Sequence, residues 1–244
     1  MLPIPQRIRT LAAAATVARL TVDGVPSRAR GGVDEHGRPV LLVLPGEPLH
    51  ALHRLHEDAV VAVNLAAMRR LGDDEHPRGL MEVQGWAQPV PAGEARAAAI
   101  TVAAKEPNEA LFEALERYGR ADAPRLLRVD VAQVVYLTGQ ESGVLDAEEY
   151  LDALPDPLAE SAERVLAHVN AAHRAQLTKG VSRHLGREAG EVWLWELDSR
   201  GVTVRADGSL VRFLWPEPTS NGTDLEEALK GLLCTCGHHP ATPA

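Results

Sequence analysis

The chain has 244 residues, enough to bury a core without support from disulfides or metals. Its formal net charge of −9 excludes non-specific binding to nucleic acid, which requires a basic face. The longest apolar stretch near the N-terminus, 11–18, is far shorter than the roughly 20 residues of a membrane-spanning helix. Cys234 and Cys236 are too close to form a favourable disulfide. We therefore expect a cytoplasmic protein that binds neither membranes nor nucleic acid.

The first two-thirds of the chain predict a β-rich domain with inserted helices. Helix formers occupy 7–15, and the apolar segments after them have the length and pattern of strands. The predicted strands are 16–22, 27–33, 39–44, 59–65, 79–89 and 126–137. The other predicted helices are a short one beginning at Pro48, then 93–105 and 107–118.

Two prolines in the segment 152–157 mark a boundary, because neither can continue a helix and both favour extended neighbours. A helix over 158–179 is predicted to follow, and then a meander of three strands, 191–197, 202–205 and 210–214. The last helix is expected to open with a capping box at Thr223-Asp224-Leu225-Glu226. We thus expect domains at 1–154 and 155–233 and a flexible tail at 234–244.

The segment after this boundary resembles a known junction. It reads Pro155-Asp156-Pro157-Leu158 and, from Glu163 to His173, Glu-Arg-Val-Leu-Ala-His-Val-Asn-Ala-Ala-His. The pattern is similar to the HugZ-type haem-utilisation branch of the pyridoxamine-phosphate-oxidase-like (FMN-binding) proteins. The resemblance implies an α+β fold, with an antiparallel split β-barrel followed by a small α+β domain of helix, three-strand meander and helix. It also implies a homodimer with pockets for a tetrapyrrole or a flavin at the subunit interface.

The His-x-Asn-x-x-His pattern within that segment comprises His168, Asn170 and His173. On one continuous helix, a five-residue step places the two histidines roughly 140° apart. One metal ion could not easily bind both, so ligation is the lesser alternative. We expect these side chains to brace the meander through hydrogen bonds, because buried polar atoms are nearly always paired.

Arg28 and Arg30 would lie on one face of the predicted strand 27–33. In flavin-binding members of the group, basic residues near this place hold the FMN phosphate, which the guanidinium geometry matches. The same arginines could instead bind haem propionates or face water. The next residues are Gly31-Gly32-Val33, where FMN-dependent relatives commonly carry a further basic or hydroxyl group.

Two further groups are candidate ligands. His50 and Arg54 belong to a helical cluster that could present an imidazole to haem iron, position a phosphate, or simply be a polar helix face. The tail Cys234-Thr235-Cys236-Gly237-His238-His239 contains zinc and haem ligand types in an unusual spacing. HugZ-type proteins supply an axial histidine from a C-terminal loop, which implies His238 or His239 by location. A tail without a site is the alternative.

Three functions are compatible with these observations. The preferred one is a haem-binding protein, with haem degradation or utilisation as its activity. The second is an FMN-dependent oxidoreductase, in which the flavin supplies the chemistry. The third is a non-catalytic split-barrel module that acts through protein contacts.

Overall fold

A computed structural model describes residues 2–54, 59–233 and 242–243. The chain divides into two compact units. The barrel unit comprises Ile8–Met68 and His76–Leu154, and the C-terminal unit comprises Met1–Arg7, Arg69–Glu75 and Pro155–Ala244. Among the described residues, none of the helices combines the length and apolar character needed to cross a membrane.

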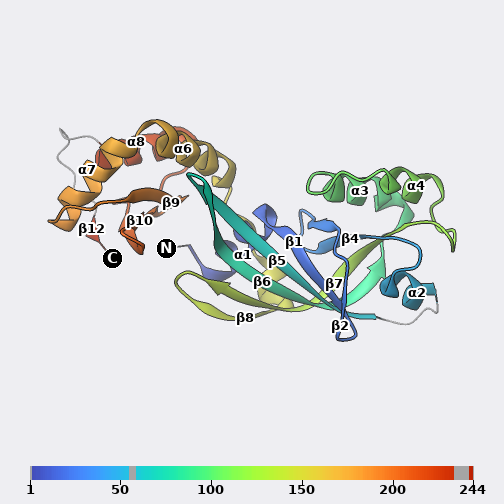
Figure 1. The fold of residues 1–244 in the computed structure, drawn as a ribbon. Coiled ribbons are helices and arrows are strands. Elements are labelled where there is room, and N and C mark those ends of the chain that lie inside the picture. The colour runs from blue at the N-terminus through green and yellow to red at the C-terminus, as the bar shows by residue number, and fades with distance from the viewer. Residues whose placement is uncertain (1, 55–58, 234–241, 244) are drawn as a thin grey trace. The chain divides into compact units, whose positions relative to one another are not determined.

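The barrel unit is built on an eight-stranded sheet in the order β2-β1-β5-β6-β7-β4-β3, with β8 paired to β7 (Figure 1). The strands are β1 Thr16–Val22, β2 Val25–Ser27, β3 Gly31–Val33, β4 Pro39–Val43, β5 Ala59–Leu71, β6 Asp74–Pro89, β7 Arg125–Thr138 and β8 Ser142–Asp146. Alternate residues of β5 are buried, as expected for a strand with one face on a core.

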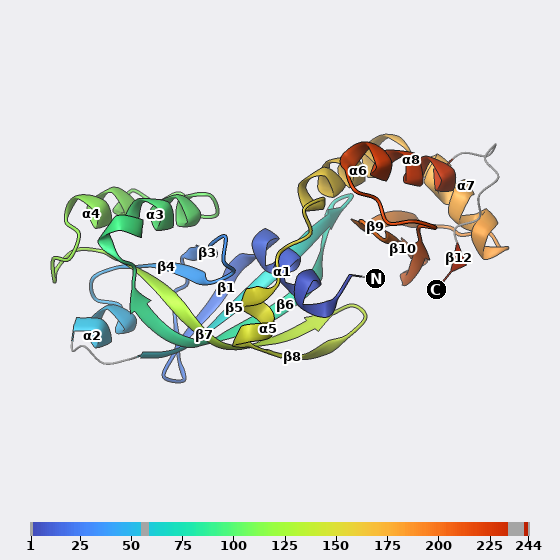
Figure 2. The same ribbon diagram turned by 180° about the vertical axis from the view of Figure 1, so that it is seen from behind.

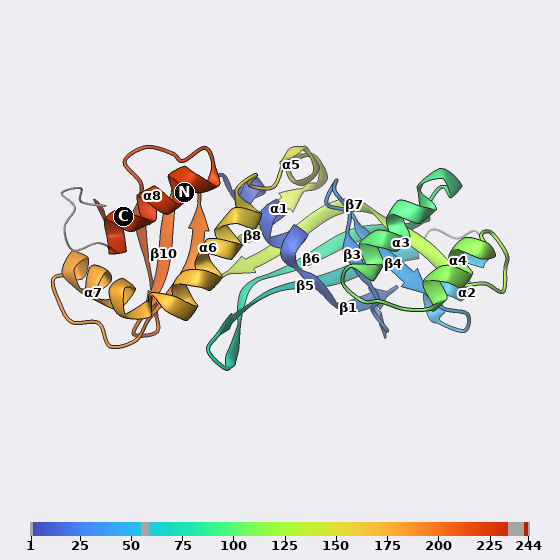
Figure 3. The same ribbon diagram turned by 90° about the horizontal axis from the view of Figure 1, so that it is seen from above.

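Two apolar clusters stabilise this unit. The inner one joins the buried faces of the sheet to α1 (Ile4–Ala14) and to Tyr150 of α5 (Ala147–Asp152). The second lies on the other side of β4 and is formed with α3 (Ala95–Ala103) and α4 (Ala110–Glu116). Figure 3 shows these two helices over this end of the sheet. The remaining helices are α2 (Pro48–Arg54) and the 3₁₀ turn η1 (Ala92–Glu94). This architecture confirms the antiparallel, split-barrel type of fold expected from the sequence.

The C-terminal unit is a small sheet with helices on one face (Figure 2). Its strands lie in the order β12-β11-β10-β9, and its core centres on the fully buried Phe213 and Leu177. The elements are α6 Ala159–Ala172, α7 Arg174–Leu185, β9 Val192–Asp198, β10 Gly201–Ala206, β11 Ser209–Leu214, α8 Gly222–Leu233 and β12 Thr242–Pro243. The predicted three-strand meander is thereby confirmed.

Three local predictions were wrong. The strand predicted at 27–33 is interrupted, because 28–30 form no regular structure between β2 and β3. The helix predicted over 158–179 is interrupted at His173, whose backbone angles (φ −126°, ψ 19°) are not helical, and it resumes as α7 at Arg174. The cap of the last helix is Asn221 rather than Thr223, since Asn221 Oδ1 accepts a hydrogen bond from the Asp224 N–H at 3.0 Å. Asparagine is a favourable N-cap residue, and Asn221 lies two residues before Thr223, so the helix begins earlier than predicted.

Candidate functional site

The two arginines proposed from the sequence have different environments. Arg30 is 3% exposed, and its Nη1 donates to Glu47 Oε1 at 2.7 Å. The other oxygen of Glu47 accepts the Leu44 N–H at 2.8 Å, which secures the pair. Arg28 is exposed, in the segment between β2 and β3. The expectation that both arginines share one strand face is therefore wrong, because the chain leaves the sheet between them.

Close packing requires glycine at positions 31 and 32, which follow Arg30 in the chain. An added Cβ at Gly31 would lie 2.2 Å from the Val40 carbonyl oxygen, and one at Gly32 would lie 2.7 Å from the Thr101 carbonyl oxygen. Both distances are shorter than any van der Waals contact. A hydroxyl or basic side chain, of the kind that FMN-dependent relatives carry here, therefore has no room at either position.

The proposed helical cluster contributes a histidine that is already engaged. His50 is 2% exposed, and its Nε2 lies 2.9 Å from the carbonyl oxygen of Ala123. A carbonyl oxygen only accepts, so Nε2 carries the proton and has no lone pair for a metal. Arg54 ends α2, but its side chain lies outside the described part of the structure, as do His238 and His239.

An exposed apolar patch covers the outer face of β6, β7 and β8. We define the outer sheet patch as Leu80, Val135, Leu137 and Val144, which are between 37% and 57% exposed. Leu80 is the cross-strand partner of Leu137, and Val135 is the partner of Val144, so the four side chains are contiguous. Contiguous exposed apolar surface of this kind marks interaction sites.

A short polar ladder adjoins the outer sheet patch. Gln84 Nε2 donates to Glu82 Oε1 at 2.6 Å, and Gln133 Nε2 donates to Gln84 Oε1 at 2.7 Å. Glu82 lies opposite Val135 in the sheet, so the ladder begins where the apolar pairs end. The face therefore combines an apolar area with directional hydrogen-bonding groups, as protein interfaces do.

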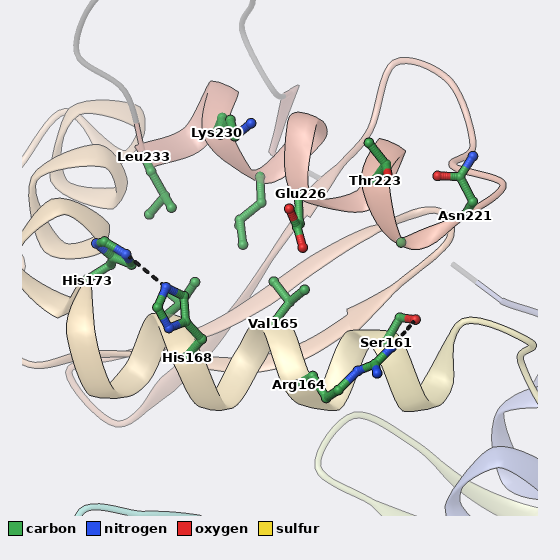
Figure 4. Close-up of a pocket in the computed structure, with 13 residues that line it drawn as sticks. Ser161, Arg164, Val165, His168, His173, Asn221, Thr223, Glu226, Lys230 and Leu233 are labelled. Atoms are coloured by element: carbon green, nitrogen blue, oxygen red, sulfur yellow. Dashed lines mark hydrogen bonds between the residues drawn. The ribbon is translucent and has the colours of Figure 1, made fainter.

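A cleft of about 790 Å³ lies between α6 and α8 of the C-terminal unit (Figure 4). Its apolar lining comes from Val165 and Val169 of α6 and from Leu229 and Leu233 of α8. Its polar lining is Ser161, Arg164, His168, His173, Asn221, Thr223, Glu226 and Lys230. Its volume is within the range of small-molecule sites.

The two histidines of the sequence pattern meet at one end of this cleft. Their Nε2 atoms are 3.1 Å apart and their rings are nearly perpendicular, at 72°. The expectation that spacing keeps them apart is wrong, because it assumed a continuous helix, whereas α6 ends at Ala172 and His173 is not helical. The bracing role is confirmed for Asn170, whose side chain bonds both the N–H and the C=O of Leu194.

Comparisons with known proteins identify the fold. No protein-family model matches the chain, and no curated protein matches it. Among solved structures, a haem-binding protein from Mycobacterium smegmatis matches 96% of this chain and 97% of its own, with 21% identity and a TM-score of 0.61. A protein of unknown function from Agrobacterium tumefaciens matches 96% and 98%, with 18% identity and a TM-score of 0.41. This chain and the haem-binding protein from Mycobacterium smegmatis share one fold over nearly their whole length. The TM-score of the Agrobacterium tumefaciens protein is too low to support an argument.

Proposed function

We propose that this protein binds haem as a homodimer, with the cofactor held at the interface between two copies. The observation that carries the proposal is the likeness to the haem-binding protein of Mycobacterium smegmatis, which extends over 96% of this chain. It agrees with the resemblance of the His-x-Asn-x-x-His junction to the haem-utilisation branch.

The outer sheet patch supports the dimer. A two-fold interface uses the same surface on both subunits, so the surface must be self-complementary. Apolar pairs such as Leu80 with Leu137 can pack against their own copies, and the Glu82-Gln84-Gln133 ladder can fix their register. Leaving this face in water would cost about 25 cal/mol for each Å² of apolar area.

Haem is favoured over FMN by the surroundings of Arg30. A flavin phosphate needs several donors, yet the Arg30 guanidinium is bonded to Glu47 and the two glycines after it have no space for a side chain. Haem needs an apolar enclosure and an iron ligand, with a cation for its propionates. For these roles we propose His238 or His239 on iron and Arg28 beside a propionate.

Haem binding is tested by titrating the purified protein with hemin and following the Soret band. We expect a saturable shift that weakens at least tenfold in the double variant His238→Ala/His239→Ala. His36→Ala, which removes an exposed histidine from a turn of the barrel unit, is the matched control and should bind as the parent does. Absence of a saturable Soret shift would refute the proposal. Loss of the band on adding a reductant and oxygen would assign haem degradation.

The dimer is tested by light scattering coupled to size exclusion. We expect a dimer that Leu137→Glu converts to a monomer, because the new carboxylate would be buried without a partner. Phe112→Glu is the control, since Phe112 is 71% exposed on α4 and away from the outer sheet patch. A monomeric parent, or a Leu137→Glu variant that stays dimeric, would contradict this interface. A dimer that does not bind hemin would favour the non-catalytic module.

A further inference from the structure

We propose that His168 and His173 bind a divalent transition-metal ion at the end of the cleft between α6 and α8. The proposal concerns the C-terminal unit alone and does not depend on haem binding. Imidazole nitrogens are preferred ligands of Zn²⁺, Cu²⁺ and Ni²⁺. A pair of them facing one point on the surface is the smallest arrangement that can chelate such an ion.

The distance between the two imidazoles agrees with joint ligation. In a tetrahedral site with Zn–N bonds of about 2.0–2.1 Å, two ligand nitrogens lie about 3.3 Å apart. The Nε2 atoms of His168 and His173 are separated by 3.1 Å. To bind one ion, the donating Nε2 would lose its proton and both rings would rotate until their lone pairs face the same point. Without an ion, the Nε2–H of one ring must donate a hydrogen bond to the Nε2 of the other, since two acceptors would not bond.

The backbone near the pair is well positioned for binding. The helix break at His173 turns its ring back toward His168, which a continuous helix would have prevented. Between them, Asn170 is bonded to both backbone groups of Leu194, at 2.9 and 2.8 Å, and so fastens the end of α6 to β9. A site held in place before binding loses less conformational entropy when the ion arrives.

Access and charge also favour a cation. His168 is exposed and His173 is half-buried, so an ion can reach both and water can complete its coordination. Glu226 lies on the opposite wall with its carboxylate directed into the cleft (Figure 4). The two cations of the lining are paired with other groups: Arg164 with Glu160 and Ser161, and Lys230 with Glu227.

The described residues contain no group of three or more histidine, cysteine or carboxylate side chains arranged around one point. The site we propose has two protein ligands, so water would occupy its remaining coordination positions. Open coordination is the property that lets a bound metal accept water or a substrate group.

The test is calorimetric titration of the metal-free full chain with ZnCl₂. To remove competing ligands, the parent for every measurement carries four substitutions in the tail: Cys234→Ser, Cys236→Ser, His238→Ala and His239→Ala. His168→Gln and His173→Gln are made in this parent, because glutamine can keep a hydrogen bond to the remaining histidine while being a poor zinc ligand. His36→Gln is the matched control.

We expect saturable Zn²⁺ binding by the parent and by His36→Gln, and at least tenfold weaker binding by each cleft variant. Circular dichroism confirms that all four proteins are folded. Lack of saturable binding in the parent would overturn the proposal. So would cleft variants that bind Zn²⁺ as well as the control does, since the histidines would then serve only each other.

Discussion

Asn170 provides a quantitative test of how the C-terminal unit is held together. β9 is the edge strand of its sheet, and the Asn170 side chain bonds the Leu194 N–H and C=O as a neighbouring strand would. Leu194 is fully buried, so water cannot easily replace these bonds. Asn170→Ala leaves two backbone groups unpaired, each costing about 1–2 kcal/mol, and we expect a total loss of about 2–4 kcal/mol.

Tryptophan fluorescence during urea unfolding measures this loss. The reporters Trp193, Trp195 and Trp215 all belong to the C-terminal unit, whereas Trp86 belongs to the barrel unit. A Trp86→Phe background therefore confines the signal to the unit that is perturbed. The same loss should lower the midpoint of thermal unfolding by about 10–20 °C for a unit of roughly 100 residues.

Ala171→Ser is the matched control, because it changes an exposed position one residue further along α6. We expect it to alter the unfolding free energy by no more than about 0.5 kcal/mol. A loss in Asn170→Ala that is no greater than in this control would refute the reasoning. The Leu194 N–H and C=O at the edge of β9 would then find other hydrogen-bond partners in the variant.

Two further predictions concern the same unit. An added Cβ at Gly180 would lie 2.1 Å from the Leu232 carbonyl oxygen, so Gly180→Ala should cost about 1–3 kcal/mol in urea unfolding, whereas Gly231→Ala, with open space around it, should stabilise by up to about 1 kcal/mol. Hydrogen bonds from Arg187 and from two backbone N–H groups lower the pKa of Asp207, so its carboxylate stabilises the fold above the ordinary pKa of 3.8 and ceases to do so as the pH falls through the lowered value. Urea unfolding at about pH 5 and about pH 3 should therefore show a smaller acid-induced loss for Asp207→Asn than for the parent.

The sequence alone determined the elements whose cause is local. The segment 16–22 predicted β1 with its observed bounds, and the three predicted strands of the meander agree with β9, β10 and β11 to within one residue at each end. The class of fold, which the resemblance to a known family implied, agrees with the observed sheets on either side of the two prolines. Strands and helices can be predicted from local apolar patterns because backbone conformation depends largely on nearby side chains.

Only the tertiary structure decided which distant side chains meet. The Glu47 carboxylate accepts a hydrogen bond from Arg30, and the Ala123 carbonyl accepts one from His50. Neither partner is adjacent in sequence. The meeting of His168 with His173 depends on a helix break that helical periodicity did not reveal. The outer sheet patch likewise exists because strand register brings Leu80 beside Leu137. A functional site depends on these non-local contacts. Composition and residue spacing do not predict them, because they depend on how distant segments pack together.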